Sequence, residues 1–307
     1  MLVLRKYDKC IFILKNIYVY IKCNMEEHKY MNRVERKIDL KEHQQIMFQI
    51  LCDYADFCDK HNLKYYLDAG TLLGAVRHKG FIPWDNDIDV CMMRPDYDRF
   101  ITLIKGGEQI NDHLVLEIPD ETMYTFLKIG DKRTRLIEYP DTEPEECYIY
   151  IDVFPKDGIS DLSKKSAFVC KISGVCALFH WFNKHSISYW SHRKKGVKRL
   201  FAKIMGVLVF DKNIAYKLQN RLIRGYTKKN PISQCEYVTT LVNGEFNGCC
   251  PRNCWDNSIA LQFETRCFKA PVGYDTWMSI LYGNDYMTPP PPDKQRVHNV
   301  QAYIKEG

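Results

Sequence analysis

The chain has 307 residues, a formal net charge of +6 and 46% hydrophobic residues, a globular composition that excludes intrinsic disorder. This length is enough for one large or two modest domains with a sizeable core. The 13 cysteines are scattered and odd in number, so we expect free thiols in a reducing cytoplasm. The apolar run near the start is too short and too polar to span a membrane, and we expect 1–30 to be a poorly defined appendage.

A helical apolar stripe begins at Asp39 and predicts a helix that ends near His61. Residues 63–67 then read as a strand, followed by Gly70 and Thr71 and by apolar residues at helical spacing. We therefore expect a strand, a tight turn and a helix. Backbone N–H groups in such a turn, at a helix N-terminus, suit an anion such as phosphate.

Three acidic residues, Asp85, Asp87 and Asp89, follow at a spacing of two and lead into an apolar run. On a strand, Asp87 and Asp89 would point to the same face. Two neighbouring carboxylates repel each other unless a cation lies between them, and Mg²⁺ or Mn²⁺ prefers such oxygen ligands. Although a solvated loop would also explain three acidic residues, the nearby phosphate-sized turn favours metal-dependent phosphoryl transfer.

The stretch 70–89 resembles the signature of the LicD family, which has a nucleotidyltransferase fold and includes bacterial phosphocholine transferases. Fukutin-type proteins are distant relatives of the family. The resemblance covers roughly 40–160 and 260–300. It implies an α+β fold, with a nucleotidyltransferase-like mixed sheet flanked by helices.

The resemblance also implies roles for single residues. It places Gly70 and Thr71 at the phosphates of a nucleotide-linked donor, and Asp87 and Asp89 on the metal. Asn86 stands where family members often carry another Asp, which removes a charge between the two expected metal ligands.

Further along the chain, Arg94 and Pro95 predict the start of a helix that ends at 106–107. After it we expect short strands closed at the end by Pro155 and Gly158. Their expected ranges are 113–118, 124–129, 135–139 and 147–154.

A carboxylate, Asp152, lies among the aliphatic residues of the last expected strand, where a charge is costly unless it is paired or bound to metal. The family resemblance implies that Asp152 completes the metal and catalytic site. The alternative is that it caps the turn at Pro155. We also expect Lys128 and Arg133 to contact phosphate or sugar oxygens, although a solvated basic loop explains Arg133 equally well.

The segment 161–240 is predicted to be a basic helical insertion between two parts of the catalytic domain, 31–160 and 241–307. From 193 to 229 it has twelve basic residues and one acidic residue, a charge of +11, so the rest of the chain carries −5. A basic amphipathic helix fits an anionic membrane surface, ordinary packing or nucleic acid. We expect peripheral contact with the cytoplasmic face of a membrane, with packing as the main alternative and no nucleic-acid partner.

The last part of the chain again resembles the family and offers Glu264, Arg296 and His298 as candidate site residues, with surface roles as the alternative. The resemblance implies transfer of phosphocholine from a CDP-linked donor to a sugar hydroxyl of a glycan or lipid-linked glycan precursor, as in lipopolysaccharide biosynthesis. Two other readings stay open. One is a metal-dependent glycosyltransferase, and the other is a non-catalytic relative that binds glycan or membrane.

Overall fold

The computed structural model describes residues 35–119, 124–138, 140, 145–184, 214–295 and 299–306. Within this part, nine strands form one mixed sheet with the central order β1-β11-β5-β6-β3-β2, and β4, β7 and β8 extend it. The strands are β1 (Glu35–Ile38), β2 (Tyr66–Leu67), β3 (Asp89–Met93), β4 (Leu114–Glu117), β5 (Leu127–Glu138), β6 (Glu145–Ile159), β7 (Tyr237–Thr239), β8 (Cys250–Pro251) and β11 (Val300–Lys305). A hairpin of β9 (Ser258–Phe263) and β10 (Arg266–Pro271) is separate from the sheet. The α+β expectation is confirmed.

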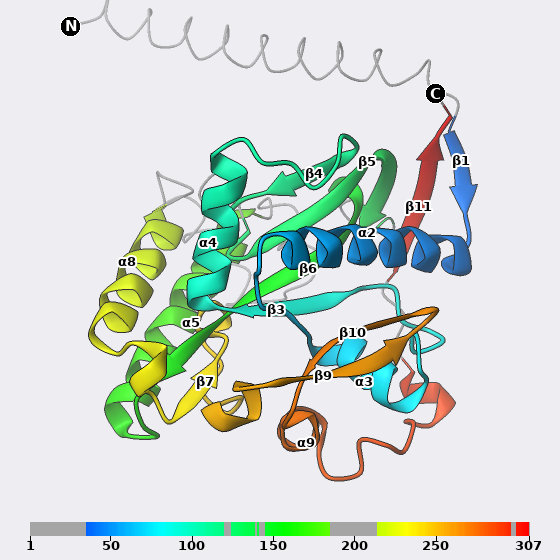
Figure 1. The fold of residues 1–307 in the computed structure, drawn as a ribbon. Coiled ribbons are helices and arrows are strands. Elements are labelled where there is room, and N and C mark those ends of the chain that lie inside the picture. Colours follow the sequence, from blue (N-terminus) through cyan, green and yellow to red (C-terminus); the bar gives the residue numbers. More distant parts are fainter. Residues whose placement is uncertain are drawn as a thin grey trace, which may run out of the picture.

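The helix α2 (Leu40–Lys60) runs across the sheet (Figure 1). Asp39 caps it, since its side chain accepts the backbone N–H of Glu42 at 2.9 Å. Met47, Leu51 and Tyr54 lie on its buried face. The predicted helix is confirmed, because one apolar stripe and one cap define it locally.

The unit that carries the acidic residues consists of β2, α3 (Ala69–Arg77) and β3. β3 pairs with β2 in antiparallel and with β6 in parallel orientation. Regular pairing begins only at Asp89, which is in register with Asp152. Our expectation that Asp87 also lies on the strand is therefore wrong: residues 85–88 are irregular backbone, and the Ile88 carbonyl accepts the Asp152 N–H at 2.9 Å.

Two predicted strands, 124–129 and 135–139, are one continuous strand, β5, with a shift of register between Asp131 and Leu136. The Thr134 hydroxyl bridges this irregularity, since it donates to the Asp131 carbonyl and accepts the Ile149 N–H. The predicted end of the following strand at Pro155 is also wrong. β6 continues to Ile159 because β3 pairs with it up to residue 156 and β7 pairs with it from residue 157.

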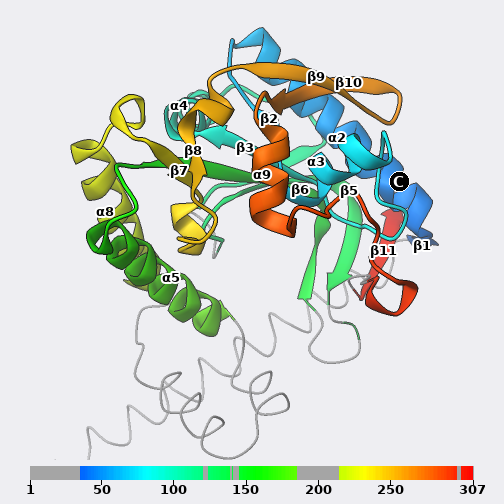
Figure 2. The ribbon, with the colours of Figure 1, turned by 90° about the horizontal axis from the view of Figure 1, so that it is seen from below.

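The helices α4 (Arg94–Lys105), α5 (Lys164–Lys184) and α8 (Ile214–Lys229) lie toward one end of the sheet, and β1 and β11 lie at the other (Figures 1 and 2). α4 matches its predicted range. Ala215, Ile223 and Tyr226 form the buried side of α8, and Gln219 donates to carbonyl groups of Ser173 and Val242. This part of the basic segment is packed on the protein.

The rest of the basic segment, 193–213, lies outside the described residues, so its membrane contact stays a prediction. The expected appendage 1–30 is also outside them. None of the helices that the structure describes is long and apolar enough to cross a membrane. The helix α9 (Tyr274–Tyr282) packs near α3, on the side of the β9–β10 hairpin (Figure 2).

Candidate active site

The start of α3 is tied directly to the acidic strand. Thr71 is buried, and its hydroxyl accepts the backbone N–H of Asp89 at 2.8 Å. The Asp68 N–H donates to the Asp89 carbonyl at 3.0 Å, and the Asp68 side chain caps α3 by accepting the Ala69 N–H. The Thr71 side chain therefore positions Asp89.

A carboxylate already lies beside this helix terminus. A Cβ atom at Gly70 would come within 2.9 Å of the Asp85 carboxylate, so glycine allows the close approach. Burial, and then the charge of Asp87, raises the pKa of Asp85 to about 8. The Asp85 carboxyl therefore lies against Gly70 at the start of α3, and phosphate binding at Gly70 and Thr71 stays a prediction.

The structure brings Asp89 and Asp152 together, as the family pattern implied. They are register partners on the parallel strands β3 and β6. Burial, followed by the charges of Asp87 and Asp152, raises the pKa of Asp89 well above its usual range. Burial also raises the pKa of Asp152, and the nearby Lys128 ammonium opposes this shift. The alternative role for Asp152, capping a turn at Pro155, does not fit a residue in the middle of a strand.

Two lysines neutralise part of this cluster. Lys128 pairs with Asp152, with 2.9 Å between Nζ and Oδ1. Lys156 is fully buried and pairs with Asp68 at 2.7 Å, while the Trp277 indole donates to the other Asp68 oxygen at 2.7 Å. Asp68 is therefore held as a structural anchor for the α3 start.

A cavity of about 220 Å³ opens beside Asp87 and Asp152. His43 of α2, Glu138 and Tyr150 also line it. Burial lowers the pKa of His43 to about 4, so its imidazole is neutral near pH 7. No pattern in the sequence points to His43, because it comes from α2, far upstream, where its neighbours in sequence are ordinary polar residues.

The carboxylates fit a hard divalent cation by their chemistry, because burial and mutual repulsion penalise the charges of Asp85 and Asp89. They do not form a closed ligand shell. Within the described ranges, no three His, Cys, Asp or Glu side chains are grouped to hold a metal ion. Asp152 in particular is paired with Lys128.

The two basic residues proposed from the sequence have different surroundings. Lys128 lies at the carboxylates, as described above. Arg133 pairs with Asp131, at 2.6 Å between Nη2 and Oδ2, and its other neighbouring charges are Asp112 and Asp53. The structure therefore does not bring Arg133 to Asp87, Asp89 or Asp152.

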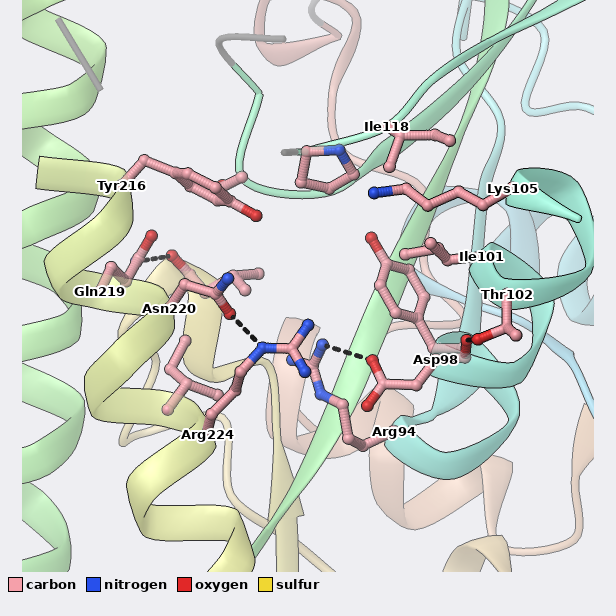
Figure 3. A pocket seen from close by; sticks show the side chains of 15 residues that line it. Arg94, Asp98, Ile101, Thr102, Lys105, Ile118, Tyr216, Gln219, Asn220 and Arg224 are labelled. Carbon is pink, nitrogen blue, oxygen red and sulfur yellow. Dashed lines mark hydrogen bonds and ion pairs between the residues drawn. The ribbon is translucent and has the colours of Figure 1, made fainter. Parts of the chain in front are cut away.

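Three further candidates come from the last part of the chain. Glu264 accepts the Phe81 N–H at 2.9 Å and thereby holds the loop after α3. Arg296 and His298 lie outside the described residues. A second cavity of about 240 Å³ lies between α4 and α8, where Figure 3 shows Lys105 and Arg224 on its two walls; it contains none of the predicted site residues.

We expect Thr71→Val to destabilise the protein and to reduce activity. The substitution keeps the shape of the side chain but leaves the Asp89 N–H without its acceptor, which costs about 1–3 kcal/mol. Urea unfolding measures the stability. Thr71→Ser keeps the hydroxyl and serves as the control. Equal stability of the Val and Ser variants would contradict the role given to this hydrogen bond.

Comparison with known proteins identifies the family. Residues 62–173 match the nucleotidyltransferase domain of LicD/FKTN/FKRP. The chain is 30% identical to the lipopolysaccharide cholinephosphotransferase LicD of Haemophilus influenzae over 283 residues, which is 88% of this chain and 99% of that protein. It is also 27% identical to the mouse ribitol 5-phosphate transferase FKRP over 93 residues, 30% of this chain and 17% of that protein. The chain belongs to the LicD family.

Proposed function

We propose that the protein transfers phosphocholine from CDP-choline to a sugar hydroxyl of a glycan or lipid-linked glycan, with Mg²⁺ or Mn²⁺ as cofactor. The observation that carries the proposal is the register pairing of Asp89 with Asp152 beside a cavity that Asp87 also lines. Similarity to a lipopolysaccharide cholinephosphotransferase along nearly the whole of that protein supports the choice of transferred group.

Asp87 and Asp89 would hold the metal ion, which would neutralise charge on the donor's phosphates when bound. Asp152 would join them through its second carboxylate oxygen, since its ion pair with Lys128 uses Oδ1. The Lys128 ammonium would contact the phosphate oxygens of the donor.

Asp152 would accept the proton of the acceptor hydroxyl, and its place in the wall of the cavity beside Asp87 supports this role. Its raised pKa makes it a stronger base than an ordinary carboxylate, provided that it is ionised. The hydroxyl oxygen attacks the phosphorus on the choline side, its proton passes to Asp152, and the bond from phosphorus to the oxygen of the cytidine phosphate breaks. The products are CMP and a phosphocholine ester of the sugar.

The place where the enzyme works depends on its acceptor. A lipid-linked acceptor would bring the enzyme to the cytoplasmic face of a membrane. The basic segment 193–229 would then supply the contact, and α8 would take part only through its exposed basic side chains, because its side with Ala215, Ile223 and Tyr226 is buried.

A donor panel tests this function. CDP-choline, a CDP-linked ribitol and a UDP-sugar, each labelled in the group to be transferred, are incubated with the protein, Mg²⁺ and a glycan acceptor. We expect label from CDP-choline to enter the glycan, and chelation of the metal to stop it. Transfer from the ribitol donor alone would reassign the substrate, and transfer from the UDP-sugar would establish a glycosyltransferase instead.

A further inference from the structure

The ammonium group of Lys128 is enclosed by three aromatic rings. Its Nζ atom lies 3.3 Å from the ring centroid of Tyr150, 4.6 Å from that of Tyr124 and 5.5 Å from that of Phe126. Asp152 adds a carboxylate oxygen at 2.9 Å, and only 5% of Lys128 is exposed. Rings within about 6 Å attract a cation through their faces. We call Tyr124, Phe126, Tyr150 and Asp152 the aromatic box.

Paired strands fix the positions of Lys128 and of two members of this box, Tyr150 and Asp152. Lys128 of β5 is the register partner of Asp152 of β6, so both side chains lie on one face. Tyr150 and Phe154 flank Asp152 at a spacing of two and share that face. The Phe154 ring packs against Phe126 with 4.4 Å between centroids. Paired strands therefore hold Lys128, Tyr150 and Asp152, whereas Tyr124 and Phe126 lie just before β5 and Phe126 is placed by its packing on Phe154.

A second buried lysine, Lys156, has a structural role and can be compared with Lys128. Lys156 also lies over aromatic rings, those of Trp255 and Trp277. Its ammonium, however, has two oxygen partners, Asp68 at 2.7 Å and Thr240 at 3.1 Å. None of these residues lines the cavity beside Asp87, whereas Tyr150 and Asp152 both do. The aromatic box thus differs from the Lys156 site in facing the reaction centre.

Three rings and one carboxylate around a cation are the surroundings that suit a quaternary ammonium group, which has no N–H to donate. We propose that the aromatic box binds the trimethylammonium group of the donor, and that Lys128 is a resident cation which the donor displaces. This inference rests on the proposed function. Two cations repel each other within one box, so Lys128 must leave as choline enters. Its flexible stem keeps the ammonium close to where the donor's phosphates would lie.

Tetramethylammonium tests the box apart from catalysis. Its binding to the full-length protein is followed by NMR or calorimetry. Tyr150→Phe keeps the ring and loses only the hydrogen bond to Glu138, so it should bind as wild type does. Tyr150→Leu removes one face of the box and should weaken binding at least about tenfold. Lys128→Met removes the competing cation and should strengthen it by about tenfold or more, whereas Lys132→Met, an exposed lysine of the same strand, should change nothing.

Circular dichroism establishes that each variant is folded, and the Phe and Leu pair at residue 150 decides the question even if Lys128→Met does not fold. With CDP-choline, Tyr150→Leu should raise the Kd about tenfold while the Kd for CDP is unchanged. If the protein transfers phosphocholine but the Leu and Phe variants bind CDP-choline equally, the box is wrong and the function stands. If tetramethylammonium follows the expected order but no phosphocholine is transferred, the function is wrong and the box stands.

Discussion

Replacing Asp89 with asparagine is expected to abolish transfer and, in the metal-free protein, to raise the thermal midpoint. Burial, followed by the charges of Asp87 and Asp152, penalises the ionised form of Asp89, and an amide removes this penalty. Relief of about 1 kcal/mol corresponds to about 1.5 °C in a protein of this size. Loss of a metal ligand costs several kcal/mol in the transition state, so activity should fall at least about 10³-fold.

The control for this prediction is Asp112→Asn, a carboxylate whose side chain is 97% exposed and which lies away from the site. It should alter neither quantity. Calorimetry in the presence of a chelator measures the midpoint, and release of CMP measures the activity. An Asp89→Asn variant that keeps full activity would contradict the mechanism. If Asp89→Asn were less stable than wild type in the absence of metal, burial and the neighbouring carboxylates would not destabilise Asp89.

Lys156→Met should have the largest effect on stability of any single substitution considered. It leaves Asp68 buried and without its countercharge, which costs about 3–5 kcal/mol. The loss should be visible as a lower midpoint in urea. Asp68 also caps α3, and Thr71 of α3 accepts the backbone N–H of Asp89. Loss of the countercharge should therefore loosen the start of α3 and lower activity together with stability.

A matched control exists on the surface. Lys269 pairs with Asp59, and both side chains are more than a third exposed, so Lys269→Met should change the unfolding free energy by about 0.5 kcal/mol or less. If Lys156→Met were no more destabilising than Lys269→Met, the buried pair would not hold the α3 start. If a destabilised Lys156→Met variant still bound CDP as wild type does, the Lys156–Asp68 pair would stabilise the protein without shaping the donor site.

The elements that could be predicted from the sequence are those with local signals. A cap at Asp39 with one apolar stripe defines α2, and Pro95 with a glycine pair defines α4. The strands were harder, because their ends depend on neighbours. Lys132 and Arg133 are polar and look like a loop, yet they belong to β5, whose irregularity is bridged by the Thr134 hydroxyl.

The carboxylates of the site could be predicted from the sequence, but the buried lysines that pair with them could not. Asp89 and Asp152 could be paired through the family pattern, since each follows or interrupts a strong apolar run. The partnership of Lys156 with Asp68 joins residues far apart in sequence, and the contacts of Lys128 with Tyr150 and Asp152 join two neighbouring strands. No local periodicity encodes such contacts, which arise only when the strands are in register.

Labelling of the phosphorus atom tests directly whether phosphocholine is transferred as one group. CDP-choline labelled with ³²P in the phosphate on the choline side is incubated with the protein, Mg²⁺ and a glycan acceptor. We expect the label to enter the glycan together with choline, in an amount equal to the CMP released, and Asp89→Asn to prevent this transfer. Label that stays with the cytidine nucleotide, or a glycan that gains choline without ³²P, would contradict the transfer of phosphocholine.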